Sequence, residues 1–413
     1  MKSETFLPYL SFSPPREDPP WVGKWRRLAG ERASALGWPT GREDAFRGTR
    51  FRALEKECFF PASGKGDPFL QADACVSDGF FVLGASRKGV LAKSLWAALE
   101  EGFAAEKELF SEPALDSVFY ALNASNFQDG ACLEFREKHE EPFSLALLAD
   151  APKVFSCPRN LVCVREESLA KLAILEAARD ASPRFTNIVT HVRVEKNGCL
   201  ELALWRRVEQ AQAVHTFWVE MEENATARMN FYSEGAEAGR VEVVVLMQGL
   251  GAKLETRSLA WLDGEFREDF HFRVRHEAPS CESLVLARAV ADGAAKAVVT
   301  GKIEVSKGAQ KTHARFESKN LLLSDDAQVD CHPELEIEAD DVEVAHGSAV
   351  GSLDAQALFY LRARGIPFAL ARAMLVSGFA RDMLWPAMGV RLDGGAKQVT
   401  PAIAAIGQEE ERG

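Results

Sequence analysis

Apolar and polar residues alternate in short runs from about residue 117 to residue 350 of the chain. A period of two is typical of β-strands with one buried face. Successive runs begin about 14 residues apart, a regular repeat, and turn-forming pairs such as Asn197-Gly198, Asp263-Gly264 and Asp292-Gly293 separate them. The repeat favours a parallel β-helix, in which each coil stacks on the next, over an antiparallel sandwich. Spacing alone leaves both folds open.

Helical spacing of apolar residues marks both ends of the chain. It predicts helices at residues 21–38 and 91–110 before the alternating region, and at residues 353–364 and 368–384 after it. A weaker helical pattern covers residues 166–179. The last helix has one apolar stripe with members three or four positions apart, namely Phe368, Ala371, Leu375, Phe379 and Met383.

These patterns divide the chain into three parts. They are an N-terminal helical region (residues 1–115), a β-helix core (residues 116–350) and a C-terminal helical region (residues 351–413). The expected fold class is mainly β, a parallel β-helix flanked by helices. The last coil of a solenoid exposes apolar edges and unpaired strand groups. We therefore expect the terminal helices to cap the ends of the β-helix.

The composition is that of a globular protein. Of 413 residues, 47% are hydrophobic and 27% are charged, and 49 Lys and Arg face 61 Asp and Glu, which gives a formal net charge of −12. This balance has the wrong sign for binding nucleic acid or anionic lipid. No apolar run approaches the roughly 18 residues of a membrane span, and the first residues lack the apolar segment of a secretory signal. We expect a cytoplasmic protein.

Common catalytic motifs do not occur in the sequence. The nearest approach to a nucleotide-binding P-loop places Gln310 at a required glycine, and the nearest dinucleotide-binding pattern places Leu254 at its third glycine. Neither G-x-S-x-G nor H-E-x-x-H is present. Eight cysteines are scattered without a C-x-x-C pair, which predicts mostly buried, reduced thiols. Enzymatic function is therefore disfavoured.

Few titratable residues cluster along the sequence. Asp340 and Asp341 precede His346 closely, and a β-helix enzyme acting on polysaccharides could use the three as acid and base. Paired carboxylates more often solvate a turn. Cys331 and His332 are adjacent, so on a strand they point to opposite faces and are poorly placed to bind one metal. The other histidines in alternating runs are expected to be structural, namely His191, His215, His271 and His276.

The last third of the chain carries a series of distinctive motifs. They are AQKT at 309–312, NLLLS at 320–324, P-x-L-E-I at 333–337, ADDV at 339–342, HG at 346–347 and LFYLRARGI at 358–366. With these motifs the sequence closely resembles the SufD family of iron-sulfur cluster assembly proteins. Weaker similarity extends upstream over most of the chain.

The resemblance implies a right-handed parallel β-helix and a non-catalytic scaffold. Members of the family work in a complex with the related scaffold SufB and the ATPase SufC, which builds a nascent iron-sulfur cluster and transfers it to recipient proteins. His346 matches the family's functional histidine, which is expected at the SufB interface. SufC is expected to dock on the C-terminal helices, through Leu358, Phe359, Tyr360, Arg364, Phe368, Leu375 and Phe379.

Two positions depart from the cysteine pattern of these proteins. Val344 stands where SufD proteins commonly have a cysteine, and Ala327 stands where SufB proteins have an essential one, which favours SufD. Cys331 is a weak candidate to replace the missing thiol. Thiolates are the usual ligands of iron-sulfur clusters, so we expect no tightly bound cofactor in the isolated chain and a cluster shared with SufB in the complex.

Three functions stay open at this point. The chain is a scaffold subunit, the β-helix enzyme described above, or a purely structural homodimer whose strand edges pair with each other. The isolated chain can also form a homodimer under the first reading. Co-purification with an ATPase and a related scaffold distinguishes the first function from the other two.

Overall fold

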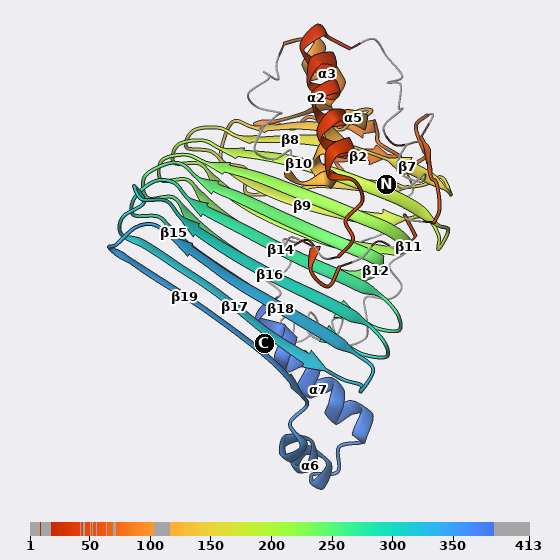
Figure 1. Ribbon diagram of the computed structural model, residues 1–413, viewed down its shortest axis with the longest axis vertical. Helices are drawn as coiled ribbons and strands as arrows, with labels where there is room; N and C mark the ends of the chain where they lie inside the picture. The colour runs from red at the N-terminus through yellow and green to blue at the C-terminus, as the bar shows by residue number, and fades with distance from the viewer. Residues whose placement is uncertain are drawn as a thin grey trace.

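A computed structural model describes residues 18–41, 72–102 and 116–383, together with Tyr9 and short stretches between residues 43 and 68. Strands stacked along one axis form the body of the molecule, a β-solenoid of about eight turns (Figure 1). Helices lie near both ends of the stack. The expected fold class, a mainly β solenoid with helices toward the termini, is confirmed.

Each coil of the solenoid contributes one strand to each of two faces. Pairing within a face is parallel and joins residues one coil apart. Lys253 pairs with Glu282, 29 residues later, and Lys296 pairs with Gln328, 32 residues later. Two strands in each coil therefore explain the spacing of about 14 residues between runs in the sequence.

We name the two faces A and B. Face A consists of β6 (Phe143–Ala149), β9 (Leu169–Ala178), the first parts of β11 (Cys199–Met221) and β12 (Thr226–Met247), β13 (Lys253–Leu262), β15 (Glu282–Ala291), β17 (Thr312–Leu322) and β19 (Val342–Ser352). Face B consists of β5 (Ala131–Phe135), β8 (Arg159–Val164), β10 (Arg184–Val194), the second parts of β11 and β12, β14 (Arg267–His276), β16 (Lys296–Val305) and β18 (Gln328–Ile337). β11 and β12 are long because each continues from one face into the other across register shifts.

The core lies between the faces, where every second side chain points inward. On β15, for example, Ser283, Val285 and Ala287 are buried and alternate with half-buried leucines. Near the end of the solenoid the interior holds the ring of Phe316, which is 1% exposed. A Cβ atom added at Gly301 would lie 2.1 Å from this ring. Glycine on β16 therefore leaves the space that Phe316 of β17 fills.

The N-terminal helices cover the outer surface of face B rather than an end of the stack. α2 (Pro20–Leu36) packs against α5 (Val118–Asn126), and α5 contacts β10 and β11. Both helices share a hydrophobic cluster with the outward side chains Phe185, Val214 and Trp218. Burial of this apolar surface holds the helices in place.

Two helices predicted from the sequence are wrong in part or in whole. Residues 91–110 begin as strand β4 (Val90–Ser94), which pairs with β5, and helix α3 covers only Leu95–Glu100. The rest of that prediction, residues 103–110, lies outside the described part of the chain. Within residues 166–179, Leu169–Ala178 form strand β9 between β6 and β11, and the middle of this strand is buried on both faces, so it reads as nearly continuous apolar sequence.

The N-terminal region also contributes strands, so it is not purely helical. β1 (Phe60–Pro61) pairs with β7 (Val154–Ser156), and β2 (Ala74–Ser77) pairs with β6 of face A. β2 also forms an antiparallel hairpin with β3 (Phe80–Gly84). These strands tie the beginning of the chain to the first coils.

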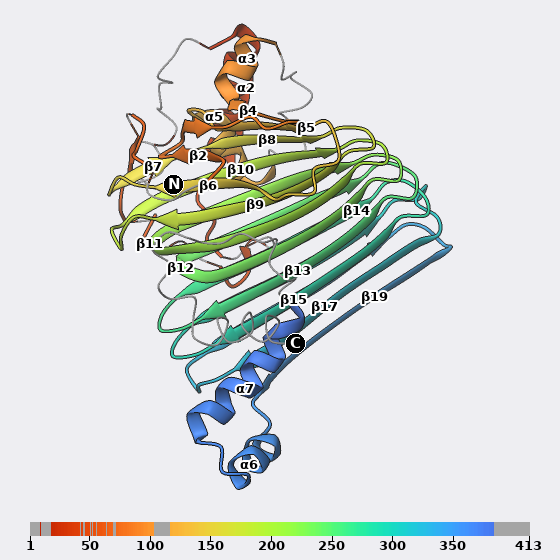
Figure 2. The same ribbon diagram turned by 180° about the vertical axis from the view of Figure 1, so that it is seen from behind.

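The C-terminal helices do not cap the last coil, and this expectation was wrong. α6 (Ala355–Ala363) and α7 (Phe368–Ala380), followed by the short η3 (Arg381–Met383), lie beside the stack (Figures 1 and 2). α7 and η3 bury Val376, Ala380 and Met383 in a cluster with Tyr232, Leu259, Val290 and Leu321, which face outward from face A. Because the apolar match for α7 is the side of the solenoid, no described helix lies over the free edges of β18 and β19.

Candidate functional site

β18 and β19 form an uncovered end of the solenoid, which we call the open end. Among the described residues, β19 pairs only with β17, and β18 pairs only with β16. Most residues of β19 are exposed, whereas interior strands such as β14 are mostly buried. Unpaired backbone groups and inward-facing side chains are thus both accessible at this end.

His346 points into the open end. Partners in a parallel ladder share a face, and His346 pairs with Phe316, the buried inward residue of the coil below. Val344 and Ser348 occupy the neighbouring inward positions of β19, above Ala314 and Ser318. The imidazole therefore lies over an apolar floor, with no described residue covering it.

Cys331 reaches the same end from face B. It pairs with the inward residue Val299 and packs against the hydrophobic core. Its Sγ accepts a hydrogen bond from Asn320 Nδ2 at 3.0 Å and lies 3.6 Å from Ser318 Oγ. Burial raises the pKa of the Cys331 thiol, and these hydrogen bonds offset part of the rise. All eight cysteines are free, and five of them are buried.

The acid–base set suggested by the sequence does not come together. Asp341 lies in the turn before β19, where its carbonyl oxygen accepts from Lys311 N at 2.6 Å and its own N donates to Gln310 Oε1 at 2.9 Å. His346 lies five residues further along an extended strand, about 16 Å away at about 3.3 Å per residue. Asp340 and Asp341 cannot share a substrate atom with His346 at this separation.

The other strand histidines have structural surroundings. His191 and His215 are buried, and their Nε2 atoms lie 2.5 Å from Tyr120 Oη and 2.8 Å from Thr190 Oγ1. His276 Nε2 lies 2.9 Å from Ser283 Oγ, and His271 is buried as well. Among the described residues, no group of three His, Cys, Asp or Glu is placed to hold a metal ion.

The C-terminal hairpin exposes a second surface of interest. Phe359 is 73% exposed, and Tyr360, Phe368 and Leu370 are each more than half exposed. Arg364 supports this surface, because its Nη2 donates to the hydroxyl of Tyr360 at 2.8 Å. We call the exposed residues of α6 and α7 the helical docking face; its members are Phe359, Tyr360, Arg364, Phe368, Leu370 and Met374.

Three of the residues expected to contact the ATPase are less exposed than the members of the helical docking face. Leu375 and Phe379 line a groove between α7 and the ends of β17 and β19, and Arg288 of face A lies 5.0 Å from the ring of Phe379. Leu358 is half-buried. Sequence reasoning missed Leu370 and Met374, which are four positions apart and lie outside the apolar stripe predicted for α7, so only the structure shows that they are exposed.

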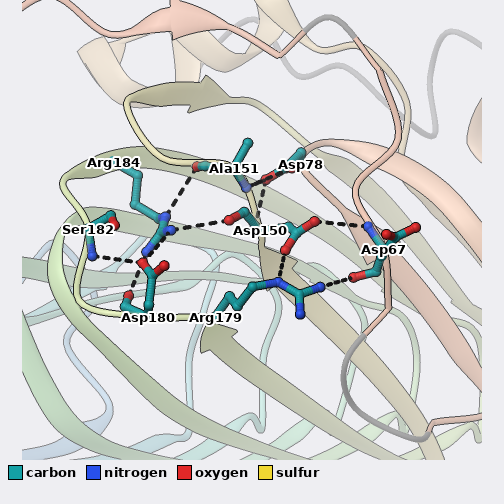
Figure 3. A network of polar contacts seen from close by, with 8 residues as sticks. All are labelled: Asp67, Asp78, Asp150, Ala151, Arg179, Asp180, Ser182 and Arg184. Atoms are coloured by element: carbon teal, nitrogen blue, oxygen red, sulfur yellow. Dashed lines mark hydrogen bonds and ion pairs between the residues drawn. The ribbon is translucent and has the colours of Figure 1, made fainter.

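The densest charge networks lie elsewhere and tie the first coils together. In Figure 3, the carboxylate of Asp78 accepts from the backbone N of Asp150 at 2.8 Å and of Ala151 at 3.0 Å. Arg184 donates to the carbonyl oxygens of Asp150 and Asp180 at 3.2 and 2.6 Å, and Arg179 pairs with the Asp150 carboxylate. Burial favours a higher pKa for Asp150, but the hydrogen bonds from Arg179 and Asp67 lower it overall.

A second network is fully buried inside the solenoid. Arg206 Nε lies 2.5 Å from Glu176, and Arg206 Nη1 lies 3.1 Å from Glu268. Burial raises the pKa of Glu268 to about 7, whereas for Glu176 the charges of Arg206 and His215 outweigh burial and lower the pKa to about 2. No described residue links this network to the open end, so we assign it to stability.

The chain folds as a β-solenoid with an uncovered last coil and a helical hairpin beside it. A family model for the SufBD core domain of SUF system FeS cluster assembly matches residues 147–379. The chain belongs to this family. In the described part of the chain, no helix combines the length and apolarity that crossing a membrane requires.

Individual relatives agree with the SufD resemblance. The chain is 29% identical over 285 residues to an iron-sulfur cluster assembly SufBD family protein of Synechocystis, over 65% of this chain and 62% of the relative. It is 33% identical over 186 residues to the iron-sulfur cluster assembly protein SufD of Escherichia coli, over 45% and 43% of the two chains. It is also 33% identical over 133 residues to SufD of Bacillus subtilis, over 32% and 30%. The chain thus spans less than two thirds of each relative's length.

Proposed function

We propose that this chain is a SufD-type scaffold subunit, without catalysis of its own, that completes a cluster-building site together with a SufB-type scaffold. The observation that carries the proposal is the position of His346 in the open end, accessible and aimed over Phe316. Neutral imidazole binds borderline metals such as iron. The nascent cluster is the cargo of the complex, not a resident cofactor of this chain.

Shared ligation follows from the donor set. Iron-sulfur clusters need several ligands, mostly thiolates, and the open end offers one imidazole and one partly buried thiol, Cys331. The partner therefore supplies the thiolates that this chain lacks. Val344 and Ala327, which replace cysteines of the related proteins, are half-buried and buried apolar residues that pack against the core.

The proposal is tested by replacing His346. The chain is co-produced with SufB-type and SufC-type proteins, and iron and acid-labile sulfide are measured for each purified complex. We expect His346→Ala to lower the cluster yield several-fold in an intact complex. His313→Ala is the matched control, because His313 is an exposed outward residue on the adjacent strand. An unchanged yield with His346→Ala refutes the ligand role.

Cys331 is the weaker ligand candidate and has its own test. If its thiol contributes, Cys331→Ser lowers the yield further in the His346→Ala background. Hydrogen bonds from Asn320 and Ser318 are available to the thiolate as well as to the thiol. Equal cluster yields for His346→Ala with and without Cys331→Ser would show that Cys331 is not a ligand.

The helical docking face is the proposed contact for the SufC-type ATPase. Its exposed aromatic side chains have the character of interface anchors, and a chain without a P-loop needs ATP hydrolysis from another subunit. We expect Phe359→Ser with Tyr360→Ser to abolish co-purification of the ATPase while the SufB-type subunit stays bound. Leu250→Ser, at an exposed leucine on a distant turn, is the control. Retention of the ATPase by the double variant contradicts this assignment.

The remaining expectations belong to the same proposal. Eight free cysteines suit the reducing conditions of the cytoplasm. The polysaccharide-enzyme alternative loses its support, because its acid and base residues are too far apart along the strand. A homodimer of the isolated chain is a distinct alternative, and the sedimentation velocity of the purified chain tests it.

A further inference from the structure

Helix α6 carries part of the helical docking face but has little hold of its own on the solenoid. None of its nine residues, all of them described, is buried, and the helix projects beyond the last strand in Figure 2. It is linked to β19 through Leu353 and Asp354, and it packs against α7, where the guanidinium of Arg362 lies 5.8 Å from the ring of Phe368. The position of the docking face therefore depends on how α7 is attached.

Apolar contacts attach α7 to face A through small side chains. Of its thirteen residues, each of which is described, Ala371, Val376 and Ala380 are buried, and Met383 of η3 is buried beside them. An alanine side chain is a single methyl group, so two of these three positions remove little apolar area from water. Contacts of another kind are needed to fix the direction of the helix.

Three polar side chains of face A hold the C-terminal end of the helix. Asn230 Nδ2 and Arg257 Nη1 donate to the last two carbonyl oxygens of η3, each at 2.6 Å, and Arg288 Nη1 donates to a carbonyl oxygen in the last turn of α7. The last four carbonyl groups of a helix have no partner within it, and the negative end of the helix dipole attracts guanidinium groups. We call Asn230, Arg257 and Arg288 the latch.

The latch residues lie on neighbouring strands below the last coil. Asn230 of β12 pairs with Arg257 of β13, and Arg288 follows on β15. A further ion pair joins Arg372 of α7 to Asp292, in the turn after β15, at 2.5 Å. Strand β17 separates β15 from β19, the strand from which the chain enters α6. The hairpin is thus attached at two separate places, covalently to the last strand and through these polar contacts to earlier strands.

The two attachments have different mechanical consequences. A force applied to α6 reaches β19 when the far end of α7 is held, whereas with that end free the whole hairpin turns about its connection to β19. Among the described residues, β19 pairs only with β17, so few hydrogen bonds oppose its displacement. A shift of β19 also moves His346, which lies on this strand.

We propose that Asn230, Arg257 and Arg288 are positioning residues for cluster assembly. The latch fixes α7 on face A, so that shape changes of an ATPase docked on the hairpin displace β19 and do not merely turn the hairpin. ATP binding and hydrolysis produce such shape changes by ordering and releasing segments of an ATPase. The inference rests on the proposed function and adds the residues through which ATP hydrolysis acts on the open end.

The test compares double variants of the full chain, alone and in the complex with SufB-type and SufC-type proteins. Arg257→Gln/Arg288→Gln removes both guanidinium groups of the latch, and Arg257→Lys/Arg288→Lys keeps the charges and one donor group at each position. Arg136→Gln/Arg228→Gln is the control with the same change of charge, because these two side chains are more than half exposed and their carboxylate partners lie on the solenoid.

Three quantities are measured for each variant. They are the hydrogen exchange of α7 amides in the isolated chain, the rate of ATP hydrolysis by the complex, and the iron and acid-labile sulfide assembled per ATP hydrolysed. We expect the glutamine variant of the latch to keep the ATPase and its rate, to exchange α7 amides about tenfold faster and to assemble about tenfold less cluster per ATP. The lysine variant should recover part of both losses, and the control should behave as wild type.

Each contrary result has its own meaning. Unchanged exchange of α7 in the glutamine variant shows that the latch does not hold the helix and overturns the inference. Faster exchange with an unchanged cluster yield per ATP, or loss of the ATPase from the complex, overturns the positioning role and leaves the proposed function standing. A wild-type complex that hydrolyses ATP but assembles no cluster contradicts the proposed function itself.

Discussion

The first and last coils of the solenoid use charge in opposite ways. In the first coils, carboxylates and arginines lie close together and pair, as Asp150 does with Arg179 (Figure 3). At the open end, six exposed carboxylates have no ion-pair partner among the described residues. They are Asp325, Asp326, Glu334, Glu338, Asp340 and Asp341. The apolar residues beside them, Leu335, Val342 and Val344, are half-buried. A region whose charged groups are paired holds the fold together, whereas a region with unpaired strand edges is arranged for association.

The same contrast applies to hydrophobic surface. α2 and α5 cover apolar side chains on the outside of face B in the first coils, and α7 covers apolar side chains on the outside of face A. The last coil has no such cover, and Phe359 and Phe368 of the hairpin remain exposed. Substitutions in the sealed regions should therefore change stability, and substitutions at the open end and hairpin should change binding.

The largest effect is expected at Arg206. Arg206→Met removes the buried guanidinium from Glu176 and Glu268 and leaves His215 as the remaining partner of Glu176, and breaking a buried pair of this kind costs about 3 to 5 kcal/mol. Arg207→Met is the matched control, because the Arg207 guanidinium is 41% exposed and its pairs with Glu209 and Glu234 are partly solvated, where such pairs contribute about 1 kcal/mol or less. The free energy of unfolding in urea measures both. Equal losses from the two variants would contradict a stabilising role for the buried network.

The next effect is the pH dependence contributed by Glu268. Burial raises its pKa to about 7 from an ordinary value of 4.5, so the folded state holds this proton more tightly than the unfolded state. Its contribution to stability is complete below about pH 4.5 and is lost as the pH rises toward 7, a change of about 3 kcal/mol.

Comparison of wild type with Glu268→Gln isolates this contribution. Burial lowers the pKa of His271 to about 3 and of His276 to about 4, so these histidines make stability rise with pH. Both proteins contain them, so their effect cancels when the stabilities of the two proteins are subtracted. We expect the stability of wild type relative to Glu268→Gln to fall between pH 4.5 and pH 8 in chemical unfolding. Parallel pH profiles for the two proteins would show that Glu268 titrates normally.

A smaller effect is expected at the floor of the open end. Gly301→Ala sets a Cβ atom against the ring of Phe316 and should cost about 1 to 3 kcal/mol through overpacking. Gly347→Ala on the open strand β19 is the control, because nothing lies within 4 Å of its added Cβ atom. Thermal unfolding of both variants measures the difference. A Gly301→Ala protein as stable as Gly347→Ala would mean that the last coil is loosely packed.

The smallest effect on stability is expected on the helical docking face. Phe359→Ala removes an exposed ring and should change the free energy of unfolding by about 0.5 kcal/mol or less. Val376→Ala, on the buried side of the same hairpin, should cost more than twice as much. A large loss from Phe359→Ala would place this ring in the fold and not in an interface.

The repeat in the sequence predicted the solenoid because two strands per coil give a local, regular pattern. The helix predicted at residues 166–179 failed because both faces of β9 are buried, with Leu172 on one and Ala173 on the other, and tertiary contacts override the helix propensity of alanine and leucine. Helical spacing found α7 but not which side of it packs on face A, so it could not show that Leu375 and Phe379 line a groove beside β17 and β19 while Leu370 and Met374 are exposed.

The candidate site shows the same limit. The motif match selected His346, but its inward direction follows only from its pairing with Phe316, 30 positions earlier. The network of Arg206 joins residues as far apart as Glu176 and Glu268, and no local pattern announces such contacts. Counting charged residues gave the sign of the net charge of the whole chain. It did not show that carboxylates are concentrated around the open end.

Hydrogen exchange of the backbone amides, with and without the SufB-type scaffold, measures the proposed role of the open end most directly. Amides of β18 and β19 are expected to exchange rapidly in the isolated chain and to become strongly protected on binding, while the first coils stay unchanged. Protection confined to the first coils, or strands β18 and β19 that exchange equally fast in the complex, would contradict it.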